Sequence, residues 1–174
     1  MGVMFFVKML FLLSPVAGSQ PPCGINCGMG SDSVYYNYSQ PGDSLIELRD
    51  SLIHYARSYI GTPYKYGGRG PNQFDCSGYT SHVFKYVSKE LPFSSRSQIH
   101  LGEKVSLDSA SKGDLIFFTS PRSGDLPGHV GIVSRNDEDG LFFIHSSTQR
   151  GVVEDRLTGY YRRRFISIRQ ILIN

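Results

Sequence analysis

The sequence predicts an α+β fold in which helices come first and an antiparallel sheet follows. Two segments in the first half repeat apolar residues at helical spacing. Five short segments in the second half are rich in β-branched and aromatic residues and are separated by turn residues, which is typical of strands. Helices followed by consecutive strands indicate α+β rather than alternating α/β architecture. The chain has 174 residues, 40% of them hydrophobic, which is enough for one compact domain.

The N-terminal segment differs in composition from the rest. Residues 1–13 are nearly all apolar, interrupted by Lys8, and Val16 and Gly18 fit the small-residue rule for cleavage after Gly18. The apolar stretch is too short for a membrane-spanning helix. We therefore predict a signal peptide over residues 1–18 and a protein exported to the periplasm, cell envelope or exterior of a bacterium. A buried N-terminal strand is the alternative.

Residues 19–43 are rich in Gly, Pro, Ser, Asn and Tyr without a sustained period, which predicts a flexible arm before a domain over residues 44–174. Cys23 and Cys27 lie in this arm. They could pair with each other, or Cys23 could carry a lipid that tethers the protein to a membrane; further ligands for a metal have no obvious source. In either case Cys76 remains as a free thiol. A free thiol in an exported protein usually has a function, such as that of a reactive nucleophile.

A capping box predicts the first helix of the domain. Ser44 and Glu47 have the spacing of that motif, and an apolar face follows them at helical spacing. This face comprises Leu45, Leu48, Leu52 and Ala56. Gly61 and Pro63 end the helix.

Asp75 predicts the start of the second helix. A Gly/Pro-rich loop over residues 61–74 precedes it, and apolar residues recur at helical spacing after it. These residues are Tyr79, Val83, Phe84 and Val87. Ser95 and Gln98 form a second capping box, which predicts a short helix ending near Gly102.

The second half predicts five strands, over residues 114–119, 129–134, 141–145, 151–154 and 165–172.

The charge pattern argues against a nucleic-acid partner, because the formal net charge is only +3 and no basic patch is interleaved with aromatic residues. We expect the arginines at 162–164 to form a solvated face rather than a substrate clamp.

Cys76 is placed for chemistry. A cysteine in the first turn of a helix faces free backbone N–H groups and the positive end of the helix dipole, which favour the thiolate. At the unperturbed pKa roughly 3% of a thiol is ionised at pH 7, and lowering the pKa to about 6 raises that to roughly 90%. The helix end supplies only about 0.3–1 kcal/mol, so a cationic partner such as histidine is needed.

Two of the five histidines suit this role. His54, His82 and His100 lie on helical segments, where a surface or packing role is expected. His129 and His145 instead flank two strand-like runs, and the midpoint between them falls at residue 137, inside a turn. They should therefore face each other across a hairpin and supply a base and its orienting partner. The alternatives are unrelated packing and a metal site, and the domain lacks a close-spaced ligand pair such as CxxC or HxxxH.

The segments GTPYKYGGRGPNQFDCSGYTSHVF, KGDLIFF, GHVGIVS and FIHSST resemble, in this order, the signature blocks of the NlpC/P60 family of cell-wall cysteine peptidases. The resemblance covers roughly residues 45–174. It implies a papain-like α+β topology with the nucleophile at a helix N-terminus. It also implies hydrolysis of amide bonds in peptidoglycan stem peptides, commonly between γ-D-glutamate and a diamino acid, without a cofactor.

The same resemblance implies roles for individual residues. Cys76 would be the nucleophile, His129 the general base that later protonates the leaving amine, and His145 the orienting residue. The Tyr64 hydroxyl would lie near the nucleophile and help to bind the oxyanion, with the backbone N–H of Cys76 as the other donor. Two further positions match residues that line the substrate groove in relatives, with helix capping as the alternative explanation: Asp75 and Ser77.

Two other functions share these features. One is a cysteine amidase or acyltransferase on the same scaffold, acting on an amide outside peptidoglycan. The other is a cell-wall binding module without catalytic turnover. We expect a monomer whose partner is peptidoglycan or a muropeptide.

Overall fold

The computed structural model describes residues 45–121 and 124–173. The predicted signal peptide over 1–18 and the arm over 19–43, with both of its cysteines, lie outside the described residues. The elements, in chain order, are α1 (Leu45–Arg57), α2 (Cys76–Lys85), α3 (Ser95–Gln98), β1 (Glu103–Val105), β2 (Leu115–Thr119), β3 (Pro127–Asp137), β4 (Gly140–Ser147), β5 (Gly151–Arg156), α4 (Gly159–Arg164) and β6 (Phe165–Gln170). No helix among the described residues is long and apolar enough to cross a membrane.

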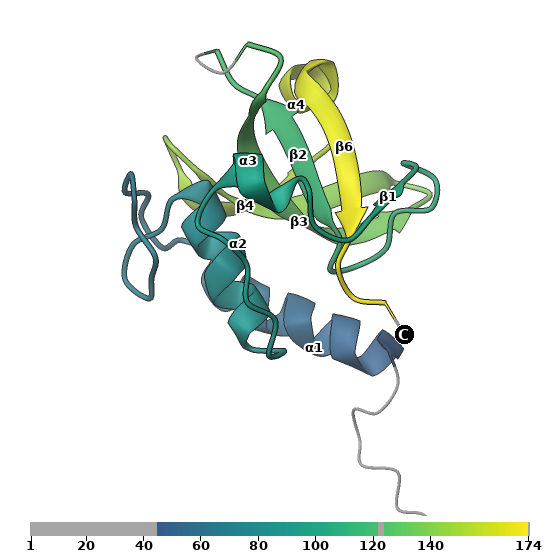
Figure 1. The fold of residues 1–174 in the computed structure, drawn as a ribbon, viewed down its shortest axis with the longest axis horizontal. Coiled ribbons are helices and arrows are strands. Elements are labelled where there is room, and N and C mark those ends of the chain that lie inside the picture. The colour runs from purple at the N-terminus through teal and green to yellow at the C-terminus, as the bar shows by residue number, and fades with distance from the viewer. Residues whose placement is uncertain (1–44, 122–123, 174) are drawn as a thin grey trace, which may run out of the picture. The chain divides into compact units, whose positions relative to one another are not determined.

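Within the described residues, six strands form one sheet in the order β1-β6-β2-β3-β4-β5, and every neighbouring pair is antiparallel. Helices α1 and α2 lie together on one side of this sheet (Figure 1). The predicted α+β class is therefore confirmed, and the five predicted strands are present with small changes at their ends. Strand β1 and helix α4 were not predicted.

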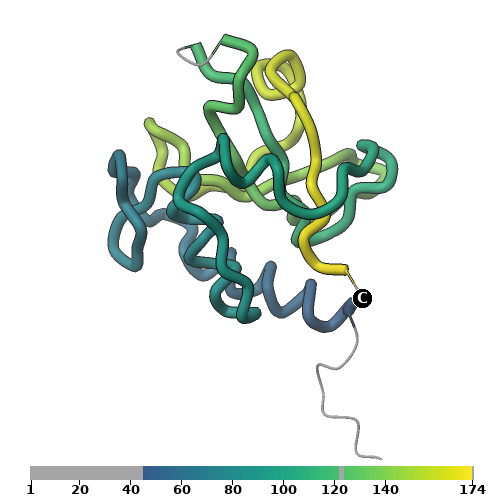
Figure 2. Tube along the Cα trace, viewed as in Figure 1, coloured from purple at the N-terminus to yellow at the C-terminus, as the bar shows by residue number. Residues whose placement is uncertain are grey.

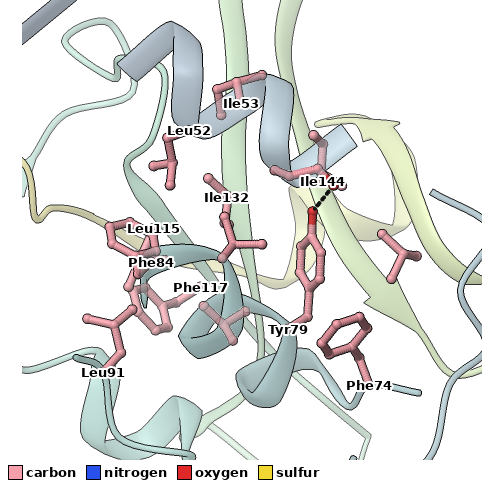
Figure 3. Packing of buried hydrophobic residues seen from close by; sticks show 14 of the residues in the cluster. Leu52, Ile53, Phe74, Tyr79, Phe84, Leu91, Leu115, Phe117, Ile132 and Ile144 are labelled. Atoms are coloured by element: carbon pink, nitrogen blue, oxygen red, sulfur yellow. Dashed lines mark hydrogen bonds between the residues drawn. The ribbon is translucent and has the colours of Figure 1, made fainter. Parts of the chain in front are cut away.

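The main core lies between the sheet and helices α1 and α2. Leu52 and Ala56 are fully buried, and Leu45 and Leu48 pack against the same cluster, so the predicted apolar face of α1 is confirmed. Figure 3 shows the Tyr79 side chain of α2 among these residues, with its hydroxyl donating a 2.9 Å hydrogen bond to the carbonyl of Ala56. This bond joins α1 to α2, the helix that begins with Cys76.

A second cluster covers the other face of the sheet. Alternate residues of β2, such as Ile116 and Phe118, point into it, while their neighbours Leu115 and Phe117 point into the main core. Because both faces of the sheet are covered here, β2 consists of consecutive apolar residues rather than alternating apolar and polar ones. Tyr161 of α4 packs against this second cluster, so α4 covers the sheet next to the imidazole pair described below.

Arg49 joins the first helix to the residue before β2 through a buried ion pair, and to the C-terminal end of the chain through a hydrogen bond. Arg49 of α1 lies 3.0 Å from the carboxylate of Asp114 and donates a 2.6 Å hydrogen bond to the carbonyl of Leu172. Figure 2 shows the C-terminal end of the chain beside the start of α1, as these contacts require. The side chain of Asp114 has no exposed surface, so its charge depends on Arg49 for compensation.

The two predicted helix starts after the first helix have different outcomes. Asp75 is the N-cap of α2, as expected, and accepts a 2.6 Å hydrogen bond from the N–H of Gly78. The prediction of a capping box at Ser95 was wrong. The N-cap of α3 is Ser94, one residue earlier, and the helix ends at Gln98. Gln98 instead turns inward and accepts a 2.9 Å hydrogen bond from Thr80 of α2.

Candidate active site

Cys76 is the first residue of α2 and a free, half-buried thiol. Its surroundings differ from the sequence expectation. Burial and, to a smaller extent, the charge of Asp75 raise the pKa of the Cys76 thiol to about 11, although the backbone N–H groups of Val130, Ser77 and Cys76 itself act in the opposite direction. The loss of water around the sulfur outweighs the helix end. The predicted lowered pKa is therefore wrong for the ligand-free protein, in which the neutral thiol is favoured.

The backbone N–H of Val130 brings strand β3 to the sulfur. It is among the groups that stabilise the Cys76 thiolate, so the start of β3 lies against the first turn of α2. The residue that precedes Val130 is His129. The strand thus places this histidine one position from a group that contacts the nucleophile candidate, although the two residues are 53 positions apart in the chain (129 − 76).

His129 and His145 are hydrogen-bonded. The distance between His129 Nε2 and His145 Nδ1 is 2.8 Å, and the two rings are nearly perpendicular, at 87°. The expected pairing of the two imidazoles is therefore present. It joins β3 to β4, the neighbouring strand of the sheet.

The strand register nevertheless differs from the prediction. The pairing Ile132↔Ile144 holds near the histidines, and the register shifts between Val133 and Arg135. One extra residue in β3 forms this irregularity, so the midpoint rule placed the strands incorrectly. Continuing the observed pairing by one residue sets His145 opposite Gly131 rather than opposite His129. The two histidines are diagonal neighbours on one face of the sheet.

Gly131 makes room for this diagonal contact. A Cβ atom at this position would lie 3.1 Å from the Cβ of His145 and 2.9 Å from Cδ2 of Phe143. Both distances are shorter than ordinary van der Waals contact. The absence of a side chain at Gly131 thus leaves space between the two imidazole-bearing residues.

Two charged residues that the sequence reasoning missed complete this cluster. Asp155 of β5 lies with Oδ2 2.9 Å from His145 Nε2, and Arg150, in the turn before β5, donates a hydrogen bond to the same oxygen. The predicted strand stopped one residue short of Asp155. In the structure β5 pairs His145 with Val153, and Asp155 lies two residues further along the same face. This register, which the sequence alone does not give, brings the carboxylate to His145.

Aromatic rings surround the imidazole pair. The Tyr161 ring centroid is 5.1 Å from that of His145, Phe143 lies 5.0 Å from the same ring, and Phe118 lies 6.1 Å from His129. Burial lowers the pKa of His129 to about 3 and also lowers the pKa of His145. Both imidazoles are therefore neutral at pH 7.

The remaining predicted residues lie on the loop and the first turn of α2. Tyr64 is half-buried and its backbone forms an isolated bridge with Phe74, two positions before Cys76. Ser77 is buried and its hydroxyl donates a 3.0 Å hydrogen bond to Asp75. The contacts of Asp75 and Ser77 are thus those of a helix cap, and their contact with substrate stays a prediction.

The three remaining histidines lie at the surface or in aromatic packing. His54 and His100 are exposed, and His82 lies with Nε2 2.8 Å from the hydroxyl of Tyr59, within an aromatic cluster. Residues 162 and 163 are exposed, in agreement with a solvated face. Within residues 45–121 and 124–173, no group of three or more His, Cys, Asp or Glu side chains is arranged to hold a metal ion.

A cysteine at the start of a helix, packed against a sheet that carries a bonded imidazole pair, defines a papain-like α+β architecture. The sequence pattern of the NlpC/P60 family matches residues 61–170. The chain belongs to the NlpC/P60 family, and the resemblance noted in the sequence is confirmed.

Three similar proteins illustrate this relationship. The chain is 35% identical over 126 residues to "Probable endopeptidase NlpC" of Escherichia coli (strain K12), covering 71% of this chain and 76% of that protein. It is 30% identical over 129 residues to "Murein DD-endopeptidase MepS/Murein LD-carboxypeptidase" of the same strain, covering 73% of this chain and 65% of that protein. The crystal structure of the NlpC/p60 domain of peptidoglycan hydrolase SagA superposes with a TM-score of 0.60 at 28% identity, covering 70% of this chain and 97% of that one.

Proposed function

We propose that this protein is a cysteine endopeptidase that hydrolyses amide bonds in peptidoglycan stem peptides through an acyl-enzyme on Cys76. Membership of the NlpC/P60 family and the printed activities of its relatives support this proposal. The observation that carries it is the bonded pair of His129 and His145, held at the start of the strand whose Val130 N–H contacts the Cys76 thiol. Nucleophile, base and orienting residue in this order are the parts that acyl transfer needs.

The chemistry follows from the neutral resting state. As the sulfur of Cys76 attacks the substrate carbonyl, its proton passes to His129, which acts as a neutral general base. The backbone N–H of Cys76 and the hydroxyl of Tyr64 stabilise the oxyanion. The imidazolium then protonates the leaving amine, and the carbon–nitrogen bond breaks to give a thioester. Water attacks this thioester with its proton passing to His129, which returns a proton to the departing sulfur.

The bond proposed is that between γ-D-glutamate and a diamino acid, the usual choice of the family. The groove would include Asp75 and Ser77, whose side chains also cap α2. Because peptidoglycan surrounds the bacterial cell, the protein is proposed to be exported, with residues 1–18 as signal peptide, and to act as a monomer in the envelope, tethered through Cys23 if that residue carries lipid.

Digestion of purified muropeptides and intact sacculi, with products read by mass spectrometry, tests the proposal. The protein is expected to release fragments ending in γ-D-glutamate, and Cys76→Ala and His129→Ala are expected to release none while keeping the same circular dichroism spectrum. His145→Ala should retain partial activity, because the base is then poorly oriented. His100→Ala, a change at an exposed histidine, serves as the control and should cut at the original rate.

The same experiment separates the alternatives. Cleavage that persists in Cys76→Ala would refute the mechanism. If the protein leaves every muropeptide intact but forms a thioester with other activated acyl donors, the amidase or acyltransferase alternative is favoured. Binding to sacculi without cleavage or acylation would favour the silent binding module.

A further inference from the structure

We infer that Asp155 is a positioning residue for the reaction: through His145 it determines which nitrogen of His129 carries a proton, and so leaves Nδ1 of His129 free to act as the base. This inference rests on the proposed function of His129, and it names a residue beyond the nucleophile, base and orienting histidine. Three hydrogen bonds support this inference: that between Asp155 and His145, that between His145 and His129, and that which Arg150 donates to Asp155.

The carboxylate of Asp155 determines the direction of the hydrogen bond with His145. An ionised aspartate can only accept hydrogen bonds. Since Asp155 Oδ2 lies 2.9 Å from His145 Nε2, that nitrogen must carry the proton. In a neutral imidazole the other nitrogen, Nδ1, then has a lone pair and can only accept. The proton on His145 is thus fixed by a residue of the next strand.

The proton position on His145 in turn determines the proton position on His129. His145 Nδ1 lies 2.8 Å from His129 Nε2, so the latter nitrogen must be the donor. A neutral His129 then has its proton on Nε2 and its lone pair on Nδ1. Without a fixed acceptor at Asp155, the reverse chain of donors would be equally available, and it would leave the proton on Nδ1. A base with its proton on that nitrogen cannot accept one from a thiol.

Asp155 is suited to this task because its ionised form is strongly favoured. The hydrogen bond with His145 and then that with Arg150 lower the pKa of the carboxyl to about 2. The charged and titratable groups around it come from three elements: His145 on β4, Arg150 in the turn before β5, and Tyr161 on α4, whose pKa is raised to about 12 by burial. Arg150 can only donate hydrogen bonds, so the group that faces it must be an acceptor. This contact therefore also favours the ionised oxygen of Asp155 at this position.

The carboxylate has a second effect during the reaction. Its negative charge raises the pKa of His129, against the larger effects of burial and of His145. The imidazolium that forms when His129 takes the thiol proton is therefore stabilised by Asp155 through the intervening ring. Asp155 itself stays ionised throughout, as expected of a residue that orients and compensates rather than transfers a proton.

Long-range ¹H–¹⁵N NMR of the histidine rings at pH 7 tests the tautomers directly, without any substrate. In the unaltered protein His129 and His145 should both show protonated Nε2 and unprotonated Nδ1. Asp155→Ala should populate the opposite tautomer in both rings. Asp155→Asn should keep the original tautomers, since the amide oxygen can accept from both Arg150 and His145. The ring signals are assigned with His129→Ala and His145→Ala.

Kinetics on muropeptides form the second part of the test. Asp155→Ala should lower kcat about 100-fold and Asp155→Asn about 10-fold, with KM within about twofold, because orientation is lost without loss of substrate contacts. The matched control is Glu154→Gln, the adjacent carboxylate on β5, which pairs with Arg57 at 2.9 Å. It should change neither the NMR tautomers nor kcat.

Two outcomes would overturn the inference. One is an Asp155→Ala protein that keeps both original tautomers, even if it is less active, because Asp155 would then have only a structural role. The other is an unaltered protein with the proton on Nδ1 of His129. If the unaltered protein cuts no muropeptide, the proposed function fails while the NMR result still decides the role of Asp155. If Asp155→Ala does not fold, Asp155→Asn provides the test, because it removes the charge and keeps the acceptor oxygen. It should lower kcat while both tautomers stay unchanged. Full activity of Asp155→Asn would refute the role of the charge in stabilising the His129 imidazolium.

Discussion

Gly78→Ala is expected to destabilise this protein, although alanine normally favours a helix more than glycine does. Gly78 lies in the first turn of α2, where the helix touches the loop before it. A Cβ atom at this position would lie 1.9 Å from the carbonyl oxygen of Gly68 and 3.2 Å from Cα of Arg69. Ordinary contact begins at 3.4 Å. The loop backbone must therefore move away by about 1.5 Å, since no flexible side chain can yield instead.

The magnitude follows from three opposed effects. Overpacking of this kind costs about 1–3 kcal/mol. Moving Gly68 also weakens the 2.9 Å hydrogen bond that its carbonyl accepts from the N–H of Asp75, at a cost of about 1 kcal/mol. Replacing glycine in a helix returns about 0.5–1 kcal/mol. The free energy of unfolding should therefore fall by about 2 kcal/mol.

Urea denaturation followed by circular dichroism measures this change. With a slope of about 2 kcal/mol per molar urea, the midpoint should fall by about 1 M. Lys85→Ala, an exposed position in the last turn of the same helix, is the control and should shift the midpoint by less than about 0.3 M. A midpoint for Gly78→Ala equal to or above that of the unaltered protein would show that the loop yields freely, and the packing argument would be refuted.

Two further changes test the buried charges and the nucleophile. Arg49→Met should lower the free energy of unfolding by about 3–5 kcal/mol at pH 7, because it leaves the buried carboxylate of Asp114 without its partner; a loss below about 1 kcal/mol in urea denaturation would contradict this. For the ligand-free protein, the raised pKa of Cys76 favours the neutral thiol until the pH approaches about 11, so the rate of alkylation by iodoacetamide should rise about tenfold per pH unit between pH 7 and 9.5. Fast alkylation that does not change over this range would instead indicate a preformed thiolate and imidazolium pair.

Local sequence patterns were sufficient for most of the elements. Periodicity gave the apolar face of α1, and the run from Asp75 predicted both the N-cap and the position of Cys76 at the start of α2. These features depend on residues within one or two helical turns of each other, so the local sequence is enough to predict them. The signature blocks also singled out Cys76, His129 and His145, which the fold places on adjoining elements.

The register of the β3–β4 hairpin shows where local patterns stop. The midpoint between His129 and His145 predicted a directly opposed pair, but the irregularity near Ser134 shifts the strands. An extra residue in one strand is set by packing on both faces of the sheet, which a count of positions cannot include. The imidazoles still meet, because Gly131 leaves room for a diagonal contact.

By itself, the sequence determined the α+β class, the family and the residues that the proposed reaction uses. Only the tertiary structure decided how those residues are held and charged. Asp155 reaches His145 from the next strand, and the pKa of Cys76 is raised rather than lowered because surrounding residues remove water from the sulfur. Both effects depend on distances between segments far apart in the chain and on the exclusion of solvent, and the order of amino acids specifies these only through the complete fold.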